Sequence, residues 1–475
     1  MVQTADIGLI GLAVMGQNLV LNMNDHGFTV AVYNRTHARV DEFLQGPAKG
    51  SKIIGAQSLD AFFASLKRPR KVMFMVKAGS AVDELINSCL PYLEPGDIII
   101  DGGNSNFEDT NRRTKELQAK GIIFLGVGIS GGEEGARHGP SIMPGGNPAG
   151  WPEVAPIFQA IAAKVQGAPC CDWVGEDGAG HYVKMIHNGI EYGDMQLIAE
   201  VYDLFHRGLG MGAEALAPIF REWNRGVLDS YLIEITSEIF TVMDSDGKPL
   251  VDHILDVAQQ KGTGKWTVIN ALDCGMPLTL IAEAVFARNL SALHEARLKA
   301  AQFLGTQIRP IEVSREEYTA SLEQALYVAK IISYTQGFML MRLAAKEYGW
   351  HLNFGGIALM WRGGCIIRSA FLGKIKEAFD REPDLESLLF SPYFAQAVKN
   401  GVPHLRRVLS QAGRSGSPTP CLSTALAFYD GLRSRELPAN LTQAQRDFFG
   451  AHTYERRDKP RGQFFHTDWL AKNEK

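Results

Sequence analysis

The sequence predicts an α/β protein: a domain with a doubly wound parallel sheet, followed by a large all-helical domain and a C-terminal tail. Near the N-terminus, a glycine-rich turn joins a strand-like apolar run to a helical pattern. Similar apolar runs then alternate with helical patterns as far as about residue 177, and strand signals disappear after that point. The length of 475 residues also exceeds what one hydrophobic core usually serves.

We expect three segments, which are the sheet domain at 1–177, the helical domain at 178–436 and the tail at 437–475. The tail follows Leu437-Pro438 and shows no sustained helical period, yet it contains several aromatic residues. Disordered tails are poor in aromatic residues, so we expect this tail to reach a twofold-related partner subunit. The alternative is that it folds back onto its own chain.

The composition argues against several classes of function. The chain is 45% hydrophobic and 21% charged, and its net charge of −4 leaves no basic field for nucleic acid or an anionic membrane. Its six cysteines show no metal-binding or disulfide spacing, and no apolar run has the length of a membrane span or a signal sequence. We therefore expect a cytoplasmic protein that acts on a small molecule.

The N-terminal turn is the first candidate cofactor site. The apolar run Ile7–Ile10 leads into Gly11-Leu12-Ala13-Val14-Met15-Gly16 and then into a helical pattern that ends near Gly27. A strand, a tight glycine turn and a helix let backbone amides approach a pyrophosphate. This pattern predicts a Rossmann-like dinucleotide site, although alanine replaces glycine at the second fingerprint position.

The next strand indicates which dinucleotide binds. Residues 29–33 are followed by Asn34-Arg35-Thr36, where an NAD-specific protein would carry an acidic residue for the ribose 2′-hydroxyl. A guanidinium and a hydroxyl favour a 2′-phosphate instead, so we expect NADP. In a second interpretation, which is compatible with the first, Thr36 caps a helix and Arg35 is simply exposed.

Further strands are predicted at 71–76, 97–101, 122–127 and 172–174. Ligands of such sheets bind beyond the carboxyl ends of the strands, which here are followed by the loops 76–78, 101–104 and 128–132. Ser130-Gly131-Gly132 can hold a carboxylate through successive backbone amides, or it is a plain glycine turn. We expect 140–146 to form another rigid loop.

One helical stretch carries the candidate catalytic groups. Lys184, His187, Asn188 and Glu191 recur at i, i+3, i+4 and i+7, which puts them on one face of a helix. Apolar residues cover much of the remaining circumference, so the polar stripe predicts a buried cleft. The alternative is a solvated face with scattered charges.

Longer helical patterns follow at 278–304, 314–348 and 366–379. Before and within them, the loop Lys261-Gly-Thr-Gly-Lys265 and the cation Arg288 can present donors to an anion. A solvated loop is an equally good interpretation of the lysine-glycine segment.

Together, these motifs resemble those of the decarboxylating 6-phosphogluconate dehydrogenases, from Ile7 to Trp469. The resemblance depends on the order and spacing of Gly11–Gly16, Asn34–Thr36, Asp101–Asn104, Ser130–Gly135, Lys184–Tyr192, Lys261–Trp266 and Arg446–His452. It implies a homodimer of the oxidative pentose phosphate pathway that converts 6-phosphogluconate and NADP to ribulose 5-phosphate, carbon dioxide and NADPH. It also implies that no metal is required.

The resemblance assigns the residues of the site. Those expected to bind the cofactor are Gly11, Leu12, Ala13, Val14, Met15, Gly16, Asn34, Arg35, Thr36, Val76, Lys77, Ala78 and Asn104. Those expected to bind the substrate are Asn104, Ser130, Gly131, Gly132, His187, Asn188, Tyr192, Lys261, Arg288, Arg446 and His452. Of these, Arg446 and His452 are expected to come from the neighbouring subunit.

For catalysis we expect Lys184 to act as general base and then as acid, and Glu191 to donate the last proton. Burial favours the neutral amine that such a base requires. Two alternatives remain open: a β-hydroxyacid dehydrogenase that does not decarboxylate, and a non-enzymatic NADPH-binding protein.

Overall fold

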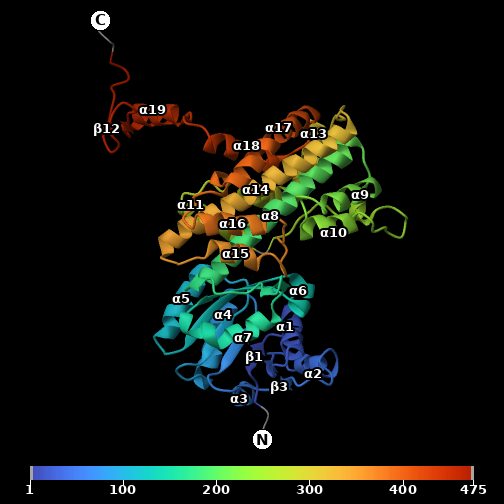
Figure 1. Ribbon diagram of the computed structural model, residues 1–475, viewed down its shortest axis with the longest axis vertical. Helices are drawn as coiled ribbons and strands as arrows, with labels where there is room; N and C mark the ends of the chain where they lie inside the picture. Colours follow the sequence, from blue (N-terminus) through green and yellow to red (C-terminus); the bar gives the residue numbers. More distant parts are fainter. Residues whose placement is uncertain (1–3, 261, 472–475) are drawn as a thin grey trace. The chain divides into compact units, whose positions relative to one another are not determined.

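The computed structural model describes residues 4–260 and 262–471 (Figure 1). The chain divides into two compact units, Met1–Ala425 and Leu426–Lys475. Among the described residues, no helix has both the length and the apolar composition needed to cross a bilayer.

An eight-stranded sheet forms the N-terminal part of the first unit, in the order β10-β7-β6-β5-β4-β1-β2-β3. Neighbouring strands are parallel except for β6 and β7. The strands are β1 (Ile7–Ile10), β2 (Val30–Tyr33), β3 (Ile54–Gly55), β4 (Lys71–Phe74), β5 (Ile98–Asp101), β6 (Ile123–Ser130), β7 (Ser141–Gly146) and β10 (Gly175–Glu176).

Helices pack on both faces of this sheet, as a doubly wound fold requires. They are α1 (Val14–Asp25), α2 (Ala38–Gln45), α3 (Leu59–Ala64), α4 (Ser80–Cys89), α5 (Phe107–Gln118), α6 (Gly132–His138) and α7 (Trp151–Ile161). In β5, Ile98 and Ile100 belong to one hydrophobic cluster and Ile99 to another. Because successive strand side chains point to opposite faces, the sheet is buried on both sides, which explains its continuous apolar strands.

Two predictions for this domain are wrong. The segment 140–146 is not a loop, because β7 pairs with β6 along its whole length. The strand expected at 172–174 is instead β10, which pairs with the end of β7. Proline and glycine made 140–146 resemble a loop, and only the long partner strand β6 shows that these residues extend the sheet. A short hairpin, β8 (Lys164–Val165) with β9 (Ala168–Pro169), precedes β10.

Helices make up the rest of the first unit. They are α8 (Ala179–Asp203) with a π-helical turn (Leu204–Gly208), α9 (Ala213–Trp223), α10 (Tyr231–Ile239), α11 (Thr263–Asp273), α12 (Thr279–Ala292), α13 (His294–Leu304), α14 (Arg315–Tyr348), α15 (Phe354–Met360), α16 (Leu372–Arg381), α17 (Pro392–Ser415) and the start of α18 (Pro420–Leu432). The long helices α8 and α14 lie side by side (Figure 1). The single helical pattern predicted at 278–304 corresponds to two helices, α12 and α13, with Leu293 between them.

The second unit contains a helix that the sequence did not indicate. The tail forms α19 (Ala439–Gly450) and a two-stranded sheet of β11 (Tyr454–Glu455) and β12 (Phe464–Phe465). Asp447 organises this unit by accepting hydrogen bonds from the backbone amides of Thr453 and Thr467 and from the indole of Trp469. The prediction that the tail contains no helix is wrong. The buried carboxylate of Asp447 holds α19 to the segment that follows, and no periodic apolar face announces this helix in the sequence.

Glu200 on α8 is a buried carboxyl group at the N-terminal end of α18. It accepts hydrogen bonds from the backbone amides of Cys421 and Leu422, both at 2.9 Å. Burial raises the pKa of Glu200 to about 7, and these amides only partly oppose that effect. The folded protein therefore binds more protons here than the unfolded chain does between about pH 4.5 and pH 7.

Since the pKa is raised on folding, this group's contribution to stability is present at pH 4.5 and is lost as the pH rises through 7. The loss is on the order of 3 kcal/mol. When the pH is raised from 5 to 7.5, we expect the Tm of the Glu200→Gln variant to fall by less than the Tm of the wild type, as measured by calorimetry. The control is Glu116→Gln, a substitution of an exposed glutamate. An equal fall in Tm for Glu200→Gln and the wild type would contradict this prediction.

Candidate active site

A cavity of about 450 Å³ lies beyond the carboxyl ends of β1, β2 and β4. Six of the predicted cofactor residues line it: Gly11, Asn34, Arg35, Thr36, Val76 and Lys77. In the described part of the chain, the other seven are outside its lining: Leu12, Ala13, Val14, Met15, Gly16, Ala78 and Asn104. Other residues that line the cavity were not predicted from the sequence: Tyr33, Arg39, Ala81, Glu84, Leu85 and Ser88. Most of them lie on α2 and α4, and no sequence motif marks which face of a helix meets the cavity.

The glycine turn beside this cavity is as tight as the fingerprint requires. Gly11 has φ +113°, and a Cβ atom there would lie 2.4 Å from the carbonyl oxygen of Met75. A Cβ atom at Gly16 would lie 2.0 Å from the carbonyl oxygen of Gly11. Ala13 has an extended backbone with φ −80°, which any residue adopts, so the missing second glycine does not disturb the turn. The turn therefore fits a pyrophosphate at the N-terminus of α1.

Close backbone contacts hold α8 against the sheet. A Cβ atom at Gly128 of β6 would lie 2.3 Å from Cβ of Lys184, and one at Gly180 would lie 2.3 Å from the carbonyl oxygen of Gly126. No side chain fits between the helix and the strands at these points. Lys184 is thereby placed beside the end of β6, where Ser130 is the last strand residue rather than part of a loop.

The predicted polar face of α8 forms a connected cluster with Ser130. Nζ of Lys184 lies 3.4 Å from Nδ1 of His187, and Nε2 of His187 lies 3.1 Å from Oγ of Ser130. Oδ1 of Asn188 lies 3.0 Å from Nδ1 of His187, and Oε2 of Glu191 lies 3.9 Å from the same nitrogen. A neutral His187 can donate to Asn188 and accept from Ser130, so the cluster is satisfied without a charge on the imidazole.

Burial sets the protonation states of this cluster. It lowers the pKa of Lys184 from its usual range, with Glu191 opposing the shift. Burial, together with Lys184, lowers the pKa of His187 well below its usual range. Burial also raises the pKa of Glu191, although Lys184 and Arg288 oppose this. Burial therefore shifts each of the three groups toward its neutral form, and these are the forms that the proposed proton transfers start from.

Residues of α11 and α12 extend the site beside the middle of α8. Nδ2 of Asn188 donates to Oγ1 of Thr263 at 3.1 Å, a contact that sequence reasoning did not predict. The guanidinium of Arg288 lies 3.5 Å from the centre of the Tyr192 ring, which places two of the predicted phosphate ligands together. Lys261, a third predicted ligand, lies outside the described residues.

Two predicted substrate residues belong to the second unit. Arg446 lies on α19, where its Nη1 donates to Oε1 of Gln443 at 3.1 Å. His452 follows the end of the helix, and its ring lies against Phe449 with centroids 5.8 Å apart. Both side chains are exposed within that unit.

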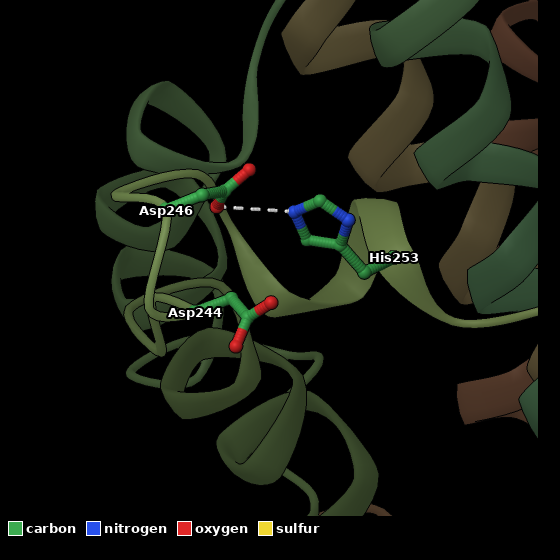
Figure 2. Close-up of side chains that lie close together, drawn as sticks. All are labelled: Asp244, Asp246 and His253. Atoms are coloured by element: carbon green, nitrogen blue, oxygen red, sulfur yellow. Dashed lines mark hydrogen bonds and ion pairs between the residues drawn. The ribbon is translucent and has the colours of Figure 1, made fainter.

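Asp244, Asp246 and His253 form a separate exposed group whose potential metal-ligand atoms lie within 4.8 Å of one another. Figure 2 shows His253 facing Asp246, and Nε2 of His253 lies 3.2 Å from Oδ1 of Asp246. Nζ of Lys248 also lies 3.5 Å from Oδ2 of Asp246. The lysine thus already provides this carboxylate with a cationic partner, and a ring nitrogen of the histidine lies at hydrogen-bond distance from it.

Comparisons with known proteins cover nearly the whole chain. Residues 6–175 match the family model of the NAD binding domain of 6-phosphogluconate dehydrogenase, and residues 180–469 match that of its C-terminal domain. The decarboxylating 6-phosphogluconate dehydrogenase of Cunninghamella elegans is 62% identical over 98% of this chain and 97% of that protein. The human protein of the same name is 60% identical over the same shares.

A solved structure agrees with this match. The 6-phosphogluconate dehydrogenase of Plasmodium falciparum, described in its apo form and in complexes with its cofactor NADP+ and its substrate 6-phosphogluconate, superposes with a TM-score of 0.94. It is 44% identical and covers 98% of this chain and 100% of that one.

A dinucleotide cavity at the sheet edge and a buried lysine beside the same edge are the features of a dinucleotide-dependent dehydrogenase. The two family models together span the sheet domain, the helical domain and most of the tail. The chain belongs to the 6-phosphogluconate dehydrogenase family.

Proposed function

We propose that this chain oxidises and decarboxylates 6-phospho-D-gluconate to D-ribulose 5-phosphate and carbon dioxide while NADP is reduced to NADPH, a reaction of the pentose phosphate pathway. The observation that carries this proposal is the buried amine of Lys184, 3.4 Å from His187 and on the same helix face as Glu191. The names of the relatives and the NADP+ and 6-phosphogluconate complexes of the Plasmodium falciparum enzyme support it. We also infer a cytoplasmic location, since all six cysteines are free thiols.

NADP, when bound, supplies the acceptor for the hydride that leaves carbon 3 of the substrate. Lys184, as a neutral amine, takes the proton of the C3 hydroxyl while that carbon is oxidised. As an ammonium, it then donates a hydrogen bond to the 3-keto oxygen and stabilises the charge that develops there. The C1–C2 bond breaks, carbon dioxide leaves, and the electron pair of the bond forms the double bond of an enediol, whose C3 oxygen takes the proton of the Lys184 ammonium. Glu191, in its protonated form, donates a proton to the carbon that has lost the carboxylate, while the enediol hydroxyl gives its proton back to Lys184, and the ketone product results.

The remaining site residues divide between the two ends of the substrate. We assign Ser130, Gly131, Gly132, His187 and Asn188 to the carboxylate and the sugar hydroxyls, with Asn104 reaching both substrate and cofactor. We assign Tyr192, Lys261, Arg288, Arg446 and His452 to the phosphate end. A dianionic phosphate requires several charge-assisted donors once water is excluded, and Arg288 beside Tyr192 provides one of them.

We further propose a homodimer in which each tail completes the partner's site. In the first unit, no residue of α13 is buried, and its Phe303 and Leu304 are 79% and 85% exposed. In the second unit, Phe448 and Phe449 of α19 are 56% and 72% exposed. A helix without buried residues has little tertiary support of its own. A second copy of the chain covers both surfaces at once through isologous pairing.

One assay separates this reaction from its alternatives. Incubation with 6-phosphogluconate and NADP is expected to yield NADPH and carbon dioxide in equal amounts. A β-hydroxyacid dehydrogenase that does not decarboxylate would yield NADPH without carbon dioxide, and a non-enzymatic NADPH-binding protein would yield neither.

Cofactor selectivity is expected to depend on Arg35, which lines the cavity together with Arg39. Arg35→Glu removes a charge-assisted contact with the 2′-phosphate and adds a repelling carboxylate. The ratio of kcat/KM for NADP to that for NAD should fall on the order of several hundred-fold. Lys49→Glu, an exposed charge reversal in the same domain, is the matched control. If Arg35→Glu kept the wild-type ratio, Arg35 would have no role in selectivity.

A further inference from the structure

Arg113 on α5 is a buried cation outside the cavity and the α8 cluster. Its side chain is 1% exposed. Its Nε and Nη2 donate to the two carboxylate oxygens of Asp83 on α4, at 2.8 and 2.9 Å. Nη2 also donates to the carbonyl oxygen of Gly79 at 3.0 Å, directly after the loop 76–78. Arg113 therefore holds the end of this loop and the helix that follows it.

The other side of Arg113 faces the loop that follows β5. Its Nη1 lies 3.6 Å from Oδ2 of Asp101, whose side chain is fully buried. Asp101 in turn shapes its loop, since its carboxylate accepts from the amide of Gly103 at 3.0 Å and from the hydroxyl of Ser105 at 2.6 Å. One guanidinium thus connects the loops 76–79 and 101–105.

The same network reaches the helix that carries the catalytic cluster. His181 of α8 is buried, with its Nε2 3.1 Å from the carbonyl oxygen of Asp101 and its Nδ1 2.7 Å from Oγ1 of Thr110. His181 lies three residues before Lys184, on the same side of the helix. The position of the loop after β5 is therefore linked to the position of α8.

Electrostatics makes this connection rigid. A guanidinium stays charged in proteins, and its planar fork matches the two oxygens of a carboxylate. The hydrogen bonds from Arg113 lower the pKa of Asp83 to about 2, with burial opposing them. Arg113 is buried although Asp83 is partly exposed, so displacing either loop would leave a buried guanidinium without its partner.

We propose that Arg113 is a positioning residue for NADP: with Asp83 and Asp101, it fixes the loops 76–79 and 101–105 in the arrangement that binds the cofactor. This inference rests on the proposed function, which assigns Val76, Lys77, Ala78 and Asn104 to NADP. Arg113 acts through these loops and is too deeply buried to contact the cofactor itself.

The test compares three variants of the full-length protein. Arg113→Lys keeps the charge but loses the fork, and Asp83→Asn weakens the link to α4 at a partly exposed site. Arg112→Gln is the matched control, because Arg112 also donates to Asp83, at 3.0 Å, but from a side chain that is 43% exposed. We would measure the Kd for NADP by calorimetry, KM for each substrate, kcat and Tm.

Both Arg113→Lys and Asp83→Asn are expected to raise the Kd and KM for NADP by about tenfold or more. The KM for 6-phosphogluconate should change less, because Asn104 is the one residue of the two loops that is assigned to that substrate. Arg112→Gln should stay within twofold of the wild type. A purely structural role would lower Tm and the active fraction but leave the Kd of the folded protein unchanged, and that result would overturn the inference. If Arg113→Lys did not fold, Asp83→Asn would decide the question.

Failure of the proposed function gives a different result. A wild-type protein that binds NADP but releases no carbon dioxide from 6-phosphogluconate would contradict the proposed reaction, and the Kd values of the variants would still test Arg113. A wild-type protein that binds no NADP would overturn both.

Discussion

Replacing Lys184 with alanine is expected to slow hydride transfer by about 10²- to 10⁴-fold, the range that a positioned general base contributes. Lys184 is buried, and its amine lies 3.4 Å from His187, which in turn contacts Ser130. The measurement is single-turnover formation of NADPH at saturating substrate. Lys115→Ala, which removes an exposed lysine from α5, is the control. A Lys184→Ala protein within a few fold of the wild type would show that another group is the base.

The pH dependence of the reaction gives a second measurement of the same role. The pKa of Lys184 is lowered by burial, and the base must be neutral, so kcat/KM should rise as the pH increases through this lowered pKa. The pKa of Glu191 is raised by burial, and this group must be protonated, so its ionisation should lower the activity. Glu191→Gln should remove the dependence on that second ionisation, and an unchanged profile would contradict the assignment of Glu191 as the final acid.

Mixing two inactive variants is expected to restore about a quarter of the wild-type sites, if the tail completes the partner's site. In a dimer of Lys184→Ala with Arg446→Ala, one site holds both defects and the other holds neither. Random reassortment makes half of the dimers mixed, so about one site in four is intact. The measurement is the activity recovered after subunit exchange, with exchange itself verified by differently tagged chains.

The double variant Lys184→Ala/Arg446→Ala provides the matched control. When it is mixed with an equal amount of wild type, each site of a mixed dimer lacks either Lys184 or the partner's arginine, so only about a quarter of the sites stay active. If the tail served its own chain, about half would stay active, and the two single variants would not complement each other. That pair of results would reassign Arg446 to its own subunit.

Much of the fold followed from local patterns in the sequence. The glycine turn at Gly11 could be recognised because its backbone tolerates no side chain, and the buried strands could be recognised because a sheet covered on both faces needs continuous apolar residues. The spacing of Lys184, His187, Asn188 and Glu191 was also sufficient to place them on one face of α8, since helical geometry is fixed.

The predictions that failed have one cause: the structure of these segments depends on contacts with residues that lie elsewhere in the chain. The strand β7 forms because β6 lies beside it, and α19 is stabilised by hydrogen bonds from Thr453, Thr467 and Trp469 to Asp447 rather than by its own periodicity. The cavity-lining faces of α2 and α4 and the contact between Asn188 and Thr263 likewise depend on how distant elements pack.

The sequence by itself determined the buried parallel strands β1, β2, β4, β5 and β6, the cofactor turn and the order of polar groups along α8, because each of these can be recognised from residues that are neighbours in the chain. Only the tertiary structure decided which pKa values are shifted and which loops are held together. The pKa shifts of Lys184 and Glu191 come from burial beneath other elements, and Arg113 meets Asp83 and Asp101 only after three segments have packed. Desolvation and ion pairing depend on distances in space, which a pattern along the chain does not specify.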